Sequence, residues 1–349
     1  MFTPAKNAAP LTPPPRLGHY VLYGWRWSYF TRKLDAALRF YGASFTFARK
    51  TPENAEELRV RGGTHQIPVL HTPENWMLAD TTPILGVLDA RFPGRALFPE
   101  GAHGLLVHAL EEYFDEWIAR TSVHWRWAYE ENHAPLSLDA TGGDEAAAAQ
   151  LRDWGGRVCR ATGVSSPAQQ AAAEAEYLRL MDAAAAQLAE TRYLLGDRPT
   201  ALDCIVLGGL RAHFLHDPAP RRVLRPRYPR VLAWAGDEEP GHEQEGEADA
   251  WDGSGELAPL PESTPFARRV LGEMATTYAA FARANAQARA EKQKAFVIPM
   301  YGEDVSYLAR GYVERSRQMV GRRLAALDPT ERSRADALLS AHGLAGVFA

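Results

Sequence analysis

Two short groups of polar side chains stand immediately before segments that the sequence predicts to be helices. Ser28 precedes one helix, and Asp80 and Thr81 precede another that begins near Pro83. The first turn of a helix leaves N–H groups unpaired and carries partial positive charge, so it favours a thiolate or a carboxylate. Asp80 adds a negative charge that can meet an ammonium, so the second group suits a zwitterion. The alternative is that Ser28, and Asp80 with Thr82, only cap their helices.

These side chains need a scaffold, and residues 18–100 predict a compact α/β unit. Apolar, β-rich runs and amphipathic runs alternate with glycine and proline stops. The order is strand 19–24, helix 30–41, strand 44–48, helix 52–61, strand 67–70, strand 76–79 and a helix from residue 83. Thr72-Pro73-Glu74-Asn75 predicts a tight turn that joins the last two strands as a hairpin. We therefore expect a four-stranded sheet with helices on both faces.

The helix predicted over 30–41 shows the usual division of a surface helix. Its apolar residues, including Leu34 and Leu38, recur on one face. Arg32, Lys33, Asp35 and Arg39 take the other side, which we expect to be the polar face.

The remainder of the chain reads as helical. A length of 349 residues suits two domains, and residues 104–349 form the second. Thr200 and Asp203 stand three apart before an apolar run, which indicates a capping box. Residues 1–17 are expected to be a flexible lead-in, and the acidic stretch 236–262, with little to bury, a mobile loop. Helical patterning resumes at Thr264, with breaks near Pro299 and Asp328.

Composition narrows the classes of partner and compartment. The formal net charge of −4 gives no attraction to nucleic acid or an anionic membrane, and no segment offers the roughly 20 apolar residues that span a bilayer. Cys159 and Cys204 form no CxxC pair, and the histidines show no HExxH pattern. We expect a cytoplasmic protein with no metal, no membrane partner and no nucleic acid partner.

Three motifs occur together in the order and spacing of a known family. They are Ser28-Tyr29-Phe30-Thr31-Arg32-Lys33-Leu34, Ile67-Pro68 and Asp80-Thr81-Thr82-Pro83-Ile84. With these motifs, residues 20–99 resemble the glutathione S-transferase superfamily, and more narrowly a bacterial branch whose substrates are mostly unassigned. Residues 194–203 are similar to the family's capping-box segment. The resemblance implies an α/β plus all-α protein: a thioredoxin-like domain with a four-stranded mixed sheet, followed by an extended helical C-terminal domain. It implies nothing dependable beyond about residue 236.

The resemblance also implies glutathione as co-substrate and groups that hold its peptide. The Ile67–Pro68 bond is expected to be cis, with the backbone of Ile67 or Val69 pairing with the cysteinyl residue. An ordinary trans bond at a strand start is the alternative. Gln66 matches a position that reaches the glycyl carboxylate, although an exposed glutamine with no role fits equally well.

For the remaining parts of glutathione, Asp80 and Thr81 match the positions that bind the γ-glutamyl end. Ser28 is the first candidate for activating the thiol, because its hydroxyl can donate a hydrogen bond to the thiolate while the helix dipole lowers the thiol pKa. Tyr23, near where other branches carry a catalytic tyrosine, is the second candidate.

Aromatic residues crowd the predicted mouth of the site. Trp25, Trp27 and Tyr29 flank Ser28, and they can stack on a planar hydrophobic substrate, fill the pocket or pack between the domains. Tyr113 and Trp117 lie on the first long helix of the second domain, which in the family lines the electrophile pocket, although a core position is the alternative.

Two functions remain open. The first is an enzyme that conjugates glutathione to a small hydrophobic electrophile, or uses it to reduce one, and that forms the family's usual homodimer. The second is a transferase-like interaction protein without catalysis, as in the metaxins and the gamma subunit of translation elongation factor one.

Overall fold

The computed structural model describes residues 12–236 and 245–349. The first eleven residues of the expected lead-in, and residues 237–244 of the expected acidic loop, lie outside the described residues. Within the described ranges, no helix combines the length and apolarity needed to cross a membrane.

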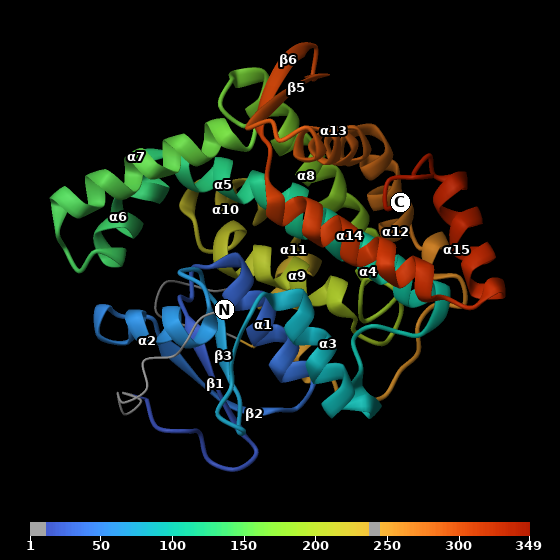
Figure 1. Cartoon of the computed structure of the whole chain (residues 1–349), viewed down its shortest axis with the longest axis horizontal. Helices are drawn as coiled ribbons and strands as arrows, with labels where there is room; N and C mark the ends of the chain where they lie inside the picture. Colours follow the sequence, from blue (N-terminus) through green and yellow to red (C-terminus); the bar gives the residue numbers. More distant parts are fainter. Residues whose placement is uncertain (1–11, 237–244) are drawn as a thin grey trace.

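The first domain has the predicted order of strands and helices. Its elements are β1 (His19–Gly24), α1 (Tyr29–Phe40), β2 (Ser44–Arg49), α2 (Pro52–Gly62), β3 (Val69–His71), β4 (Met77–Ala79) and α3 (Thr81–Arg91). The strands form a mixed sheet in the order β2-β1-β3-β4, in which β1 is parallel to β2 and antiparallel to β3, and β3 is antiparallel to β4. The predicted hairpin is present, and this thioredoxin-like domain forms the lower part of Figure 1.

Alternate residues of β1 face opposite sides of the sheet. Leu22 packs into the main core with α1, whereas Tyr23 joins a small cluster with Leu58 of α2, Val69 and Met77. The sheet is therefore covered on both faces, as expected.

The prediction of a polar face on α1 is wrong. Arg32, Lys33 and Asp35 are 6%, 0% and 6% exposed, because the second domain covers the side of α1 that carries them. α1 lies against α9 (Ala201–Gly209) in the centre of the molecule (Figure 1). The approach is close enough that a Cβ atom at Gly208 would lie 2.7 Å from the Tyr29 carbonyl oxygen.

The start of α3 also differs from the sequence-based expectation. The N-cap residue is Asp80, whose side chain makes no capping hydrogen bond, and the helix begins at Thr81. The hydroxyl of Thr82, predicted to be a cap, is instead buried and accepts a hydrogen bond from Lys33 Nζ at 3.0 Å. Thr82 therefore binds the buried ammonium of Lys33 and does not cap α3.

The second domain is helical, which confirms the predicted fold class. Its helices up to residue 236 are α4 (Gly101–Tyr113), α5 (Ala119–Ala128), α6 (Glu130–Ala140), α7 (Glu145–Ala161), α8 (Pro167–Leu188), α9 (Ala201–Gly209), α10 (Pro218–Leu224) and α11 (Pro229–Ala235). A π-helical turn, Phe114–Ile118, joins α4 to α5. The predicted capping box is confirmed, since the Thr200 amide donates to Asp203 Oδ2 at 2.7 Å.

A C-terminal extension follows, with one element that the sequence did not predict. It comprises α12 (Pro265–Glu273), α13 (Ala279–Ala290), β5 (Ala295–Met300), β6 (Glu303–Leu308), α14 (Gly311–Ala326) and α15 (Pro329–Ala341). The unexpected element is the β5–β6 hairpin at the top of Figure 1. Its two-residue turn, Tyr301-Gly302, has φ values of 58° and 79°, the left-handed conformation that two-residue hairpin turns require.

The expectation of a mobile loop over 236–262 is wrong for the described part of that stretch. Trp251 is 6% exposed and packs edge-on against Phe40, with ring centroids 6.3 Å apart. Arg211 Nη2 forms an ion pair with Asp249 Oδ2 at 2.6 Å. A single buried tryptophan and a buried ion pair thus anchor residues that the acidic composition marked as having little to bury.

Candidate functional site

The register of the sheet gathers three of the predicted site segments at one end. Val69 is paired with Tyr23 of β1 and with Ala79 of β4. The residues next in line, Gly24, Pro68 and Asp80, therefore lie side by side at the same end of the sheet. α1 and α3 both begin at this end, so two helix N-termini face the segment that carries Pro68.

Ser28 is the N-cap residue of α1. Its Oγ accepts a hydrogen bond from the Thr31 amide at 3.4 Å, and the side chain is partly exposed. Because this bond uses an oxygen lone pair, the Ser28 O–H remains able to donate to an anion in front of the helix. The capping role and the proposed donor role are therefore compatible in one side chain.

Tyr23 is placed less well for chemistry at this end. Its side chain lies in the α2 cluster, on the sheet face opposite Leu22, and is 6% exposed. The pKa of Tyr23 is raised, chiefly by burial. The charge of Glu57 adds to the rise, and a hydrogen bond with Thr12 opposes it. The geometry favours Ser28 over Tyr23.

Two residues, Ile67 and Val69, were predicted to pair with glutathione through their backbone, and only one of them is available to do so. The Ile67–Pro68 bond is cis. Val69 lies inside the sheet and is paired on both sides, so the prediction that its backbone pairs with a ligand is wrong. Among the hydrogen bonds found in the described ranges, none involves the backbone of Ile67, a partly exposed residue. Gln66 is exposed, and its amide donates to Thr64 Oγ1 at 3.0 Å.

Asp80 adopts a backbone conformation that non-glycine residues rarely use, with φ of 76°. Such strain costs on the order of 1–3 kcal/mol and clusters at functional sites. Burial is the largest cause that raises the Asp80 pKa, and a hydrogen bond with Tyr312 and the charge of Arg315 oppose the rise. The neighbouring Thr81 is 5% exposed.

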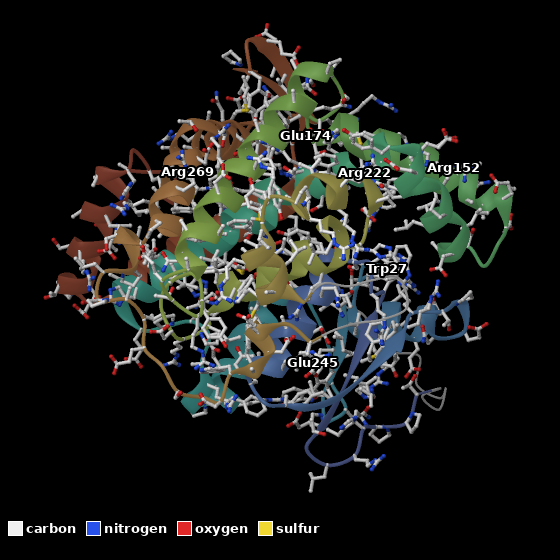
Figure 2. The ribbon with its side chains drawn as sticks, turned by 180° about the vertical axis from the view of Figure 1, so that it is seen from behind. Trp27, Arg152, Glu174, Arg222, Glu245 and Arg269 are labelled. Atoms are coloured by element: carbon white, nitrogen blue, oxygen red, sulfur yellow. The ribbon has the colours of Figure 1, made fainter. Side chains whose placement is uncertain are left out.

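Two of the three predicted aromatic residues around Ser28, Trp27 and Tyr29, pack against the second domain. Trp27 stacks on His216, with ring centroids 3.4 Å apart, and lies where the blue ribbon of the first domain meets the helical domain in Figure 2. Tyr29 is 5% exposed and lies against Gly209 of α9. Tyr29 therefore fills the domain interface, and its assignment to an open substrate pocket is wrong. Trp25 is half-buried, and its amide donates to Thr31 Oγ1 at 3.4 Å.

Tyr113 and Trp117 are core residues, which corrects their prediction as pocket residues. They are 0% and 1% exposed. The Tyr113 hydroxyl and the Trp117 Nε1 both donate to Glu176 Oε1, at 2.6 and 2.9 Å. A carboxylate buried this deeply needs hydrogen-bond donors, and these two side chains supply part of them, together with Arg120 and Thr277.

A buried charge cluster beside the site was not found from the sequence. Lys33 Nζ forms ion pairs with Glu111 and, at 2.8 Å, with Asp115. Burial alone would lower the pKa of Lys33, but the two carboxylates raise it above its ordinary value. Burial raises the pKa of Glu111 to about 7, against the opposing charge of Lys33. A lysine aligned with the charged face of α1 gave no signal that distinguished it from a solvated one.

Two cavities flank the start of α1. One, of about 310 Å³, is lined by Thr31 and Asp35, three arginines of or near α1, and Phe45 and Phe47 of β2. The other, of about 490 Å³, lies at α10 and is lined by Pro218, Pro226, three arginines and His216, the stacking partner of Trp27. The arginine-rich segment 221–230 thus includes part of α10 and borders this cavity.

The fold and this site define a thioredoxin-like domain joined to a helical domain, and two family models match the chain accordingly. The model described as "Glutathione S-transferase, N-terminal domain" matches residues 22–96, and that described as "Glutathione S-transferase, C-terminal domain" matches residues 167–236. The chain belongs to the glutathione S-transferase superfamily.

Several solved structures match the chain at low sequence identity. A glutathione S-transferase from Methylobacterium radiotolerans, in complex with glutathione sulfonate, is 21% identical, with 61% of this chain and 87% of that chain covered and a TM-score of 0.40. A theta class glutathione S-transferase from Xanthomonas axonopodis pv. citri, with glutathione bound, is 20% identical, with 62% and 90% covered and a TM-score of 0.39. A β-etherase from Sphingobium sp. strain SYK-6 is 15% identical, with 62% and 93% covered and a TM-score of 0.44. A search of curated proteins gives no match.

Proposed function

We propose that this protein is a glutathione transferase that holds glutathione at the end of its sheet and stabilises the thiolate with Ser28. The observation that supports the proposal is that Ser28, the Ile67 backbone and Asp80 converge at one end of the sheet. The N-termini of α1 and α3 lie at the same end. Family membership supports glutathione as the ligand.

Each of these groups meets a different part of the tripeptide. The Ile67 N–H and C=O are suited to pair with the cysteinyl backbone, as an added strand does at a sheet edge. Asp80 offers a carboxylate to the γ-glutamyl ammonium, and the first turn of α3 with Thr81 favours the adjacent carboxylate. Gln66, exposed beside this segment, is available to the glycyl end.

The chemistry assigned to Ser28 is stabilisation of charge. The cysteinyl thiol loses its proton to solvent, and the Ser28 O–H donates to the thiolate at the start of α1. The sulfur then attacks an electrophilic carbon, a C–S bond forms, and the bond to the leaving group breaks with its electron pair. A small hydrophobic electrophile would approach past Trp25 and Trp27, two partly exposed aromatic residues near Ser28.

The first experiment is isothermal titration of the full chain with glutathione, followed by a conjugation assay with a panel of halogenated aromatic and epoxide electrophiles. Heat of binding with turnover is the expected result. Absence of binding would refute the proposal, and binding without turnover for any electrophile would leave a binding protein without catalysis.

The role of Ser28 is tested by following the ultraviolet absorbance of the bound thiolate against pH. A hydrogen bond to a charged acceptor contributes about 1.5–3 kcal/mol, so Ser28→Ala should raise the pKa of the bound thiol by about 1–2 units. Tyr23→Phe is the matched control and should leave this pKa unchanged. An unshifted titration in Ser28→Ala would move the role away from Ser28.

A further inference from the structure

The C-terminal extension reaches the predicted γ-glutamyl position from outside both family matches. α14 runs alongside α4 (Figure 1). Its Arg315 contacts Asp80, the residue that precedes α3. Arg315 Nη2 lies 3.3 Å from Asp80 Oδ2, and Tyr312, one turn earlier on α14, is hydrogen-bonded to the same carboxylate. The contact joins residues 235 positions apart in the chain.

α14 is held in this position by several contacts that do not involve Asp80. Arg310, its N-cap residue, donates from Nη2 to the Glu116 carbonyl oxygen at 3.2 Å. The buried Ser316 hydroxyl donates to Glu112 of α4. The helix is therefore anchored on α4 and on the π-helical turn, and Arg315 is presented to Asp80 by a fixed element.

Arg315 keeps most of its donors available. Its side chain is 57% exposed, against 21% for Asp80, and its one ion-pair contact with Asp80 uses a single guanidinium nitrogen. The guanidinium carbon lies 4.5 Å from the centroid of the Tyr312 ring, which limits the directions in which the side chain can point. A guanidinium has five N–H donors in a planar fork that matches a carboxylate.

We propose that Arg315 binds the α-carboxylate of the γ-glutamyl residue while Asp80 binds its ammonium. The inference rests on the proposed function, because it assigns a second ligand to the glutathione site. The γ-glutamyl end of glutathione is an α-amino acid zwitterion, with opposite charges on one carbon. Asp80 and Arg315 present opposite charges at 3.3 Å, the order of spacing such a group requires. Asp80 has further lone pairs for the ammonium.

The opposite interpretation is that Arg315 blocks Asp80 and competes with the ligand. The guanidinium of this ion pair is 57% exposed, so solvent screens its attraction to Asp80. Its competition would change ligand affinity only a few-fold, whereas a carboxylate bound by the guanidinium fork gains charge-assisted hydrogen bonds. The exposure of Arg315 therefore favours a ligand-binding role.

The test compares three probes by isothermal titration: glutathione, 4-aminobutanoyl-cysteinyl-glycine, which lacks the α-carboxylate, and glutaryl-cysteinyl-glycine, which lacks the ammonium. Arg315→Ala should weaken glutathione and the glutaryl probe by about 10-fold or more, and leave the 4-aminobutanoyl probe unchanged. Asp80→Asn should show the reverse selectivity. Arg322→Ala is the matched control, since it removes an exposed arginine of the same helix two turns further on.

Each outcome is decisive. Tighter binding of glutathione by Arg315→Ala would show a blocking role and overturn the proposal, and equal losses for all three probes would show a merely structural one. No change in any affinity would also overturn it. If wild-type protein binds none of the probes, the proposed function itself fails, whereas glutathione binding that is indifferent to Arg315 refutes this inference alone. Thermal unfolding of each variant verifies that it is folded.

Discussion

Replacing Lys33 with methionine tests how the two domains are joined. Lys33 is 0% exposed and lies between Glu111 and Asp115 of the second domain. Methionine keeps most of the apolar stem but removes the cation, so two buried carboxylates lose their partner. Breaking a buried pair in this way costs about 3–5 kcal/mol of unfolding free energy. That is a large share of the 5–15 kcal/mol typical of a whole domain.

The penalty should depend on pH, with a sign set by Glu111. Its pKa in the folded protein is raised to about 7, and the loss of Lys33 removes a charge that lowers it, so the pKa rises further. A carboxyl group whose folded pKa lies above its unfolded value contributes stability at low pH and loses it as the pH rises through the folded pKa. The Lys33→Met penalty therefore grows as the pH rises above about 7, where Glu111 ionises in the wild type, and is smaller at about pH 5.5.

The assay is urea unfolding at about pH 8 and about pH 5.5, followed by tryptophan fluorescence and far-ultraviolet circular dichroism. Lys294→Met, at an exposed lysine, is the matched control and should change stability by less than about 0.5 kcal/mol. Adding Glu111→Gln to Lys33→Met should recover part of the loss at the higher pH. An equal penalty at both pH values would refute the reasoning, as would a loss below about 1 kcal/mol at pH 8.

Three further predictions concern single side chains. Thr200→Ala removes the capping box of α9 and should lower the unfolding free energy by about 1 kcal/mol, measured by urea unfolding; an unchanged midpoint would contradict the capping role. Tyr113→Phe removes a donor to the buried Glu176 and should cost about 1.5–3 kcal/mol in the same assay, and a neutral result would show that Glu176 does not need it. Burial raises the pKa of Glu116 to about 8, so its contribution is greatest below about pH 4.5 and is lost as the pH rises through about 8. Glu116→Gln should therefore gain stability over wild type across that window, and a constant difference between the two would rule this out.

The first domain was predictable because its signals are local. The apolar runs, the turn at 72–75 and the glycine stops depend only on neighbours in the chain, and they predicted the order of strands and helices along the chain and the β3–β4 hairpin. The capping box at Thr200 and Asp203 was local in the same sense. The position of Ser28 at the head of a helix followed from the same patterns.

The predictions that failed concern residues whose environment depends on contacts between distant segments of the chain. Lys33 looked solvated because charged residues shared its helix face, and only the packing of the second domain makes that face interior. Thr82 changed role for the same reason, since its partner is Lys33. Tyr29 was predicted to be a pocket residue because the sequence does not show that α9 covers it. The β5–β6 hairpin was hidden because a positive φ at Tyr301 has no strong sequence signal.

The link between Asp80 and Arg315 also bears on how the chain is made. A ribosome releases the thioredoxin-like part long before α14 exists, and the two residues are 235 positions apart. A second link of similar span, from Glu331 to the Ala102 amide at 2.6 Å, joins α15 to α4. Contacts so distant in sequence form late, because the intervening chain must first be synthesised and ordered. During translation Asp80 would thus lack its ion-pair partner until α14 has been synthesised.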